Sequence, residues 1–156
     1  MPIGSTAKHF EDFTTGDSFV TQGRTLTDVD NTLWTMFTGD MNPMHVDEVH
    51  AREHGLYGGR FPAGLLAVAV ASGLNERLGM FAGTGLAMTQ QSVTYRKPVL
   101  IGDTIAVRLT VTETLPKNGR PFGAVTFGYE IVRQDDDVCI DGSWTIIVKS
   151  RGAGVS

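Results

Sequence analysis

The sequence predicts an α+β fold in which one antiparallel β-sheet wraps around a single long buried helix. Residues 62–78 form an apolar segment of helical length, with Pro62 at its start and Gly79 directly after its end. Four segments rich in β-branched and aromatic residues then follow one another, which favours an antiparallel sheet over alternating strands and helices. These segments are residues 86–95, 103–114, 121–133 and 138–149.

Before the long helix, the chain predicts one strand and two shorter helices. The strand covers residues 18–25. Thr27 and Asp28 are typical helix-capping residues, and the helix they begin should end by Gly39. Its apolar face consists of residues at near-helical spacing, namely Val29, Leu33, Trp34 and Phe37. Asp47 should begin the second helix within residues 46–54, before a glycine-rich break.

The later segments complete the expected topology. The helix at residues 62–78 is apolar almost all round, which predicts burial on most of its sides. Turn-forming residues separate the strands at 102–103, 117–119 and 135–137. Because no repeat or linker is recognisable, we expect one domain over residues 1–156, with a frayed tail from residue 152. A single sheet on a single helix leaves apolar surface uncovered, so at least a homodimer is expected.

Composition excludes several classes of function. A net charge of −4, without any run of Lys and Arg, argues against a non-specific nucleic-acid surface. Cys139 is the only cysteine, so no intrachain disulfide and no cysteine-based metal site are expected; its alternating apolar context predicts a buried small side chain. The start of the chain lacks a signal-peptide core, and the apolar run at 61–74 is too short for a membrane span. We therefore expect a cytoplasmic protein with no membrane partner.

The most informative segment is residues 38–47, which places Asp40 and His45 five residues apart. Gly39 permits a backbone turn that other residues resist, and Pro43 moves Asn42 out of the helical region. These residues predict a shaped loop that is neither a regular helix nor a regular strand. An aspartate and a histidine that converge in such a loop form a proton-transfer pair.

This segment resembles the signature of the MaoC-like dehydratases, a family that includes the (R)-specific enoyl-CoA hydratases. The central match is Gly39-Asp40-Met41-Asn42-Pro43-Met44-His45, followed by Asp47 and Ala51. Looser matches cover most of the chain: Phe10-Glu11-Asp12-Phe13, Gly16-Asp17, Gly23-Arg24-Thr25-Leu26-Thr27, Gly64-Leu65-Leu66, Tyr95-Arg96-Lys97-Pro98-Val99 and Gly102-Asp103-Thr104.

The resemblance implies a hot-dog fold and reversible syn hydration of a trans-2-enoyl-CoA to an (R)-3-hydroxyacyl-CoA, with no cofactor. It also implies a homodimer or dimer of dimers whose acyl-CoA sites lie along the subunit interface. The carrier of the acyl group is CoA or acyl-carrier protein, and chain length, branching and a dicarboxylate preference stay open. Hydrolysis by a hot-dog thioesterase and a non-catalytic hot-dog subunit of a dehydratase complex are the alternatives.

By the same resemblance, Asp40 and His45 hold and activate a water molecule, and His45 delivers the proton to C2. Asn42 would orient the pair or the substrate through its amide. Gly64 is the candidate for the oxyanion hole, because a helix N-terminus exposes N–H groups and glycine allows close approach. Many relatives have His-Gly before this helix, whereas this chain has Phe61-Pro62-Ala63-Gly64, which alters the pocket wall.

Two further sets of residues concern ligands. Arg60, Arg96 and Lys97 are the candidates for contacts to the phosphates of CoA. His50 and His54 are four residues apart, a spacing that can bind zinc together with His45 and Asp40. Hydration of an activated thioester needs no metal, however, so we expect none.

Overall fold

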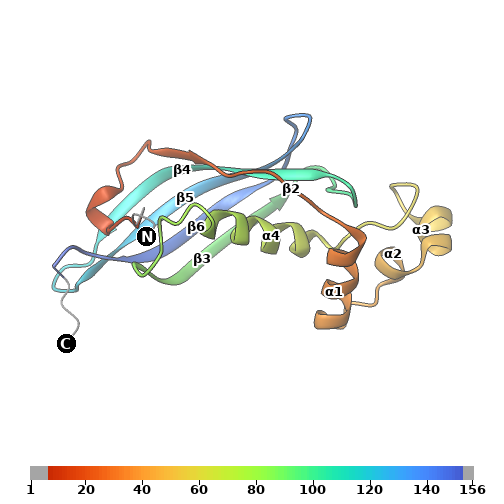
Figure 1. The fold of residues 1–156 in the computed structure, drawn as a ribbon, viewed down its shortest axis with the longest axis horizontal. Coiled ribbons are helices and arrows are strands. Elements are labelled where there is room, and N and C mark those ends of the chain that lie inside the picture. The colour runs from red at the N-terminus through yellow and green to blue at the C-terminus, as the bar shows by residue number, and fades with distance from the viewer. Residues whose placement is uncertain (1–6, 153–156) are drawn as a thin grey trace, which may run out of the picture.

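The computed structural model describes residues 7–152 and contains one antiparallel sheet that curves around a central helix (Figure 1). Within these residues the sheet has six strands in the order β1-β4-β5-β6-β3, and β2 pairs with β4 beside this path. The predicted frayed tail lies outside the described residues apart from Gly152. Strand bounds are β1 Ser18–Val20, β2 Arg24–Thr25, β3 Gly85–Tyr95, β4 Thr104–Pro116, β5 Phe122–Arg133 and β6 Val138–Lys149.

The helices precede the long strands, as the sequence predicts. They are η1 Phe10–Asp12, a 3₁₀ turn, followed by α1 Asp28–Thr38, α2 Pro43–Val46, α3 Glu48–His54 and α4 Gly64–Glu76. The predicted α+β fold, with an antiparallel sheet around one buried helix, is confirmed. None of the helices within residues 7–152 has the length and apolar character that crossing a membrane requires.

The core lies between α4 and the concave face of the sheet. Alternate residues of β4, β5 and β6 are buried there, including Phe127 and Trp144, which are at most 1% exposed. Trp144 therefore packs in the core. Cys139 is also fully buried, and burial raises the pKa of its thiol, so it acts as a small core side chain.

The predicted strand at residues 18–25 is wrong as one continuous element. It is two short strands, because the chain leaves the sheet's backbone ladder between β1 and β2. At Thr21, the N–H donates to the Val107 carbonyl while the Thr21 hydroxyl accepts from the Val107 N–H. A side-chain oxygen thus replaces the carbonyl that a regular strand would use, which explains the interruption.

Helix α1 is capped as predicted but buries an unexpected face. Thr27 and Asp30 form a capping box at its start, and Gly39 ends it with a φ of 74°. Its apolar residues are largely exposed, Leu33 at 62% and Phe37 at 89%. The predicted helix is confirmed, but its fully buried residues are the polar Asn31 and Thr35 and do not belong to its apolar face.

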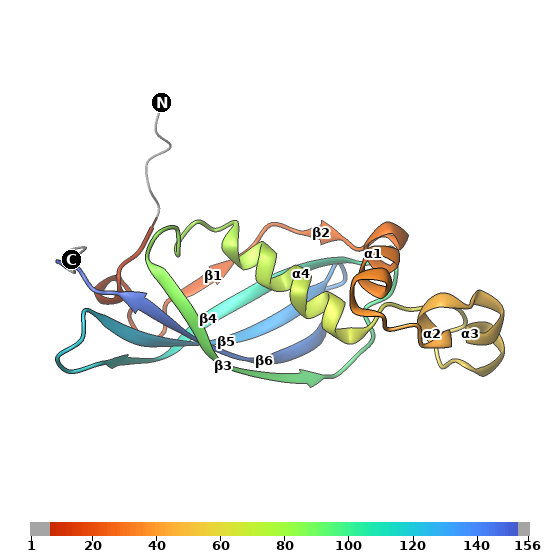
Figure 2. The ribbon, with the colours of Figure 1, turned by 90° about the horizontal axis from the view of Figure 1, so that it is seen from below.

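Residues 39–63, here called the lobe, contain α2 and α3 and project beyond the end of α4, away from the sheet (Figures 1 and 2). The prediction that residues 38–47 hold no regular helix is wrong, because α2 begins at Pro43. Proline suits the first helical position, where its missing N–H would have no partner. Asn42 and Asp47 cap α2 and α3 with their side chains.

Thr27 allows a test of the α1 cap. Its hydroxyl accepts from the Asp30 N–H, so Thr27→Ala should lower the free energy of unfolding by about 1 kcal/mol. Urea unfolding followed by circular dichroism measures this loss. Thr32→Ala, at an exposed interior position of the same helix, is the control and should be neutral or stabilising. Equal losses in both variants would contradict the role of the cap.

Candidate functional site

The candidate site is the contact between Asp40 and His45, which the structure brings together as predicted. Asp40 follows the left-handed turn at Gly39, just after α1, and His45 lies within α2. Asp40 Oδ2 is 3.8 Å from His45 Nε2. The His45 side chain is 10% exposed, whereas that of Asp40 is 41% exposed. The pair therefore has one buried partner and one partner that solvent or a ligand reaches.

The other polar atoms of His45 all have partners. Its N–H donates to the Asn42 carbonyl at 2.8 Å, and its carbonyl accepts from Asn31 Nδ2 at 2.9 Å. Its ring Nδ1 is 2.7 Å from the Phe61 carbonyl oxygen. Because a carbonyl oxygen only accepts, Nδ1 must carry the proton in this bond. In the neutral ring, Nε2 is then the unprotonated nitrogen, and it lies 3.8 Å from Asp40 Oδ2.

The pair therefore presents two hydrogen-bond acceptors side by side. The 3.8 Å between Nε2 and Oδ2 is longer than a hydrogen bond, so the two atoms are neighbours that do not satisfy each other directly. Such a pair can accept both protons of one water molecule and can take one of them as a base. The arrangement supports proton transfer without any metal-bound group.

Asn42 has a structural task in the lobe. Its side-chain amide oxygen accepts from the Met44 N–H and so caps α2. The backbone N–H of Asn42 donates to Asp40 Oδ1 at 3.4 Å. Asn42 thus links Asp40 to the start of the helix that carries His45. A direct contact from its amide to a substrate stays a prediction.

Gly64 begins α4, where the sequence analysis expects the oxyanion hole. A Cβ atom at this position would come within 2.5 Å of Tyr95 Cε1 on β3, so a larger residue would have to displace the Tyr95 ring. Ala63 is the N-cap, and its side chain makes no capping hydrogen bond.

The three predicted phosphate-binding cations fall into two places. Arg96 and Lys97 line a cavity of about 200 Å³ together with Gly64 and Phe61. Each already has an acidic partner: Arg96 Nε is 2.7 Å from Asp141, and Lys97 Nζ is 2.7 Å from Asp137. Neither Asp40 nor His45 lines this cavity.

Arg60 lies apart from that cavity and holds the lobe together. Its guanidinium is 3.1 Å from Asp28 on α1 and 3.3 Å from Glu48 on α3, and its N–H also donates to Glu48. The Arg60 N–H and the Arg52 side chain lower the pKa of Glu48. These contacts join α1, α3 and the segment that precedes α4.

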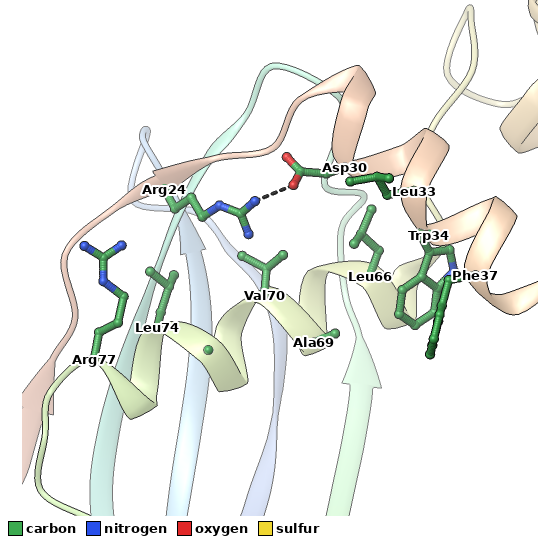
Figure 3. Close-up of a pocket in the computed structure, with 11 residues that line it drawn as sticks. Arg24, Asp30, Leu33, Trp34, Phe37, Leu66, Ala69, Val70, Leu74 and Arg77 are labelled. Atoms are coloured by element: carbon green, nitrogen blue, oxygen red, sulfur yellow. Dashed lines mark hydrogen bonds and ion pairs between the residues drawn. The ribbon is translucent and has the colours of Figure 1, made fainter. Parts of the chain in front are cut away.

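A larger groove of about 700 Å³ runs between α1 and α4 (Figure 3). Leu66, Val70 and Leu74 form its side on α4, and Leu33, Trp34 and Phe37 form its side on α1. Arg24, paired with Asp30, and Arg77 line the groove at the other end from Phe37 (Figure 3). The exposed apolar residues of α1 therefore border a groove and do not enter the core.

Among the residues that the structure describes, His50 and His54 on α3 are not joined by further side chains that could bind a metal ion with them. The rings of His50 and His54 are 4.7 Å apart, and neither is paired with His45. Within residues 7–152, no three His, Cys, Asp or Glu side chains are arranged to hold a metal ion.

Sequence reasoning missed two groups that contact His45. One is the backbone carbonyl of Phe61, which leaves no signature in residue types. The other is Asn31, for which the sequence holds no signal: it lies on the polar side of α1, which the pattern would leave exposed, whereas the structure buries it.

The sequence of this chain is similar to those of known proteins. A family model described as MaoC like domain matches residues 11–132. The (R)-specific enoyl-CoA hydratase of Rhodospirillum rubrum is 32% identical over 145 residues, which cover 92% of this chain and 94% of that protein. Protein MaoC of Klebsiella aerogenes is 34% identical over 116 residues, which cover 72% of this chain and 33% of that protein. The chain thus spans about a third of the latter.

The fold has a solved counterpart. The crystal structure of the MaoC-like dehydratase from Rhodospirillum rubrum superposes with a TM-score of 0.82 at 24% identity, over 93% of this chain and 99% of that one. The fold expected from the resemblance is therefore confirmed.

Glu48 provides a test of how the lobe is held. Since its pKa is lowered in the folded protein, its contribution to stability is present above its ordinary pKa and is lost as pH falls through the lowered value. Glu48→Gln should therefore be less stable than the wild type at neutral pH, and this difference should shrink toward zero in acid. Unfolding curves across this pH range measure it. A difference that stays constant with pH would show that the Glu48 charge is not involved.

Proposed function

Because the chain belongs to the MaoC-like domain family, we propose that it is a hydro-lyase that adds water reversibly to a trans-2-enoyl-CoA and forms an (R)-3-hydroxyacyl-CoA. The observation that carries this proposal is the pair of adjacent acceptors, His45 Nε2 and Asp40 Oδ2. The activity for which the Rhodospirillum rubrum relative is named supports the same reaction class. The (R) configuration rests on that relative and on the family resemblance, not on a distance in this chain.

In the proposed mechanism, one water molecule donates its two hydrogens to Nε2 and to the Asp40 carboxylate. Its oxygen forms a bond to C3 of the alkene while Nε2 takes one of its protons. The electrons of the C2=C3 double bond move toward C2 and the thioester carbonyl. Nε2 then delivers its proton to C2. Both additions come from the same side of the alkene, so the hydration is syn, and the imidazole is neutral again.

The thioester carbonyl carries negative charge during this step, and we propose that the first turn of α4 stabilises it. Gly64 supplies a backbone N–H at the positive end of the helix dipole. Arg96 and Lys97 line the cavity next to Gly64, so we propose that they contact the phosphates of the CoA. Arg60 is engaged with Asp28 and Glu48, and we propose that it acts on the lobe more than on the ligand.

We also propose that residues 1–156 form one domain that pairs with a second copy through β3. This strand hydrogen-bonds to β6 on one side, and no other described strand pairs with its opposite edge. All but one of its residues are exposed, and they include Leu86 and Met88. An exposed edge strand of this length that carries apolar side chains favours pairing with another strand. A dimer of dimers would need a further surface.

Asp40→Asn tests the mechanism. This variant keeps the size of the side chain but removes the carboxylate, and it should lower the rate of crotonyl-CoA hydration by about 10²- to 10⁴-fold. The assay is loss of the enoyl-thioester absorbance. Glu53→Gln removes a charge from an exposed position of the same lobe and should keep wild-type activity.

Release of free thiol in place of hydration would identify a thioesterase. Full hydration activity in Asp40→Asn would exclude Asp40 from the mechanism. No reaction of the wild type with a panel of enoyl thioesters would favour a non-catalytic subunit.

The double variant Leu86→Lys/Met88→Lys tests the edge. In an antiparallel β3–β3 pair the introduced charges of two copies come close together, so the dimer should dissociate. Light scattering coupled to size-exclusion chromatography should show twice the chain mass for the wild type and a single chain for the variant. Leu115→Lys changes an exposed apolar residue on β4, which is not a neighbour of β3, and should stay dimeric. A monomeric wild type would refute the pairing.

A further inference from the structure

Helix α1 buries polar side chains and exposes apolar ones, which reverses the usual arrangement of a surface helix. Asn31 is 1% exposed and Thr35 is 4% exposed. The Thr35 hydroxyl donates to the Thr32 carbonyl of its own helix. Asn31 is different, because its amide donates to another element: Nδ2 is 2.9 Å from the backbone carbonyl of His45.

The His45 carbonyl needs such a donor. The last four carbonyls of an α-helix have no partner within the helix, and α2 has only four residues. Its Pro43 carbonyl accepts from Asp47, whereas the His45 carbonyl accepts from Asn31. A buried carbonyl without a partner would be costly, so the Asn31 amide fixes α2 against α1 at the residue that carries the imidazole.

The cost of burying Asn31 indicates what its amide does. Asn31 Oδ1 has no hydrogen-bond partner among residues 7–152, and a buried acceptor left without one destabilises a protein. Leucine has the same number of side-chain heavy atoms with the same branching and would avoid that loss. A gain in helix packing therefore does not account for an amide at this position, whereas the bond to His45 does.

We propose that Asn31 is a positioning residue for the reaction: through the His45 carbonyl, it holds the imidazole at the distance from Asp40 at which both accept from one water molecule. The inference rests on the proposed function. Asn31 acts together with the bond from His45 Nδ1 to the Phe61 carbonyl, since one contact holds the backbone of His45 and the other holds its ring. Substrate does not contact Asn31, which is buried between α1 and α2.

Asn31→Leu tests this role. The variant removes the donor while keeping the number and branching of the side-chain heavy atoms, and kcat for crotonyl-CoA hydration should fall on the order of 10- to 100-fold with little change in KM, because a shift of about 1 Å in a reacting group has effects of this size. Thr35→Val is the matched control: it removes a buried polar group from the same helix, one turn further on, that bonds only to its own helix. It should stay within about twofold of the wild type, far below the positioning effect.

The second readout does not depend on activity. Nitrogen-15 NMR of the His45 ring reports which nitrogen carries the proton and what surrounds it. In Asn31→Leu the His45 ring signals should shift or broaden, whereas in Thr35→Val they should match the wild type. A general loss of stability would affect both variants and would not single out His45.

A further variant, Asn31→Asp, is tested as well. It decides whether Asn31 positions His45 if Asn31→Leu does not fold. An ionised aspartate has no proton to donate to the His45 carbonyl, so the kcat of Asn31→Asp relative to the wild type should fall as pH rises. The charged groups on the neighbouring elements, namely Asp28, Asp30, Asp40, His45 and Arg60, are present in both proteins, so the ratio isolates position 31.

Unchanged kcat and unchanged His45 ring signals in a folded Asn31→Leu would overturn the positioning role while leaving the proposed function intact. A wild type without hydratase activity would instead refute the proposed function, and the ring signals would still decide whether Asn31 positions His45.

Discussion

The hydrogen bond between His45 Nδ1 and the Phe61 carbonyl is the contact on which the rest of the site depends. It assigns the ring proton to Nδ1 and thereby leaves Nε2 as an acceptor that faces Asp40. It also ties α2 to the segment that leads into α4, with Gly64 only three residues beyond Phe61. A single backbone carbonyl therefore sets the chemical state of the base and couples it to the helix end proposed to polarise the substrate.

The sheet and the lobe contribute in different ways. The sheet holds α4 by burying an apolar core, in which Phe127, Trp144 and the inner face of α4 are excluded from water. The lobe has few apolar contacts of that kind and is held by directed polar bonds, such as those from Arg60 to Asp28 and Glu48. Directed bonds specify angles as well as distances, which suits a site where two acceptors must lie side by side. The lobe ends directly before Gly64, whose close approach to Tyr95 holds the start of α4 against β3.

Patterns that reflect local chemistry predicted the fold well. The long strands and α4 follow from β-branched and apolar runs, and Asp40 and His45 follow from one motif. Three features could not be predicted, because the residue types in the sequence do not reveal their physical cause. The Phe61 carbonyl is a backbone group, the Thr21 hydroxyl replaces a strand carbonyl, and a helical pattern shows an apolar face without showing what covers it. Arg60, Arg96 and Lys97 are cations whose acidic partners come from other elements, so the sequence alone overstated how freely they meet a ligand.

The partners of His45 also differ from the rest of the fold in where they lie along the chain. Asn31, Asp40, Asn42 and Phe61 all precede β3, whereas the sheet closes by pairing residues as distant as Ser18 and Thr110. During synthesis, these four partners of His45 have therefore all been added to the chain before the first long strand, β3, has been made. The contacts of His45 thus join residues that lie close together in the sequence and are synthesised early. The long-range strand pairing that forms later builds the sheet that supports them.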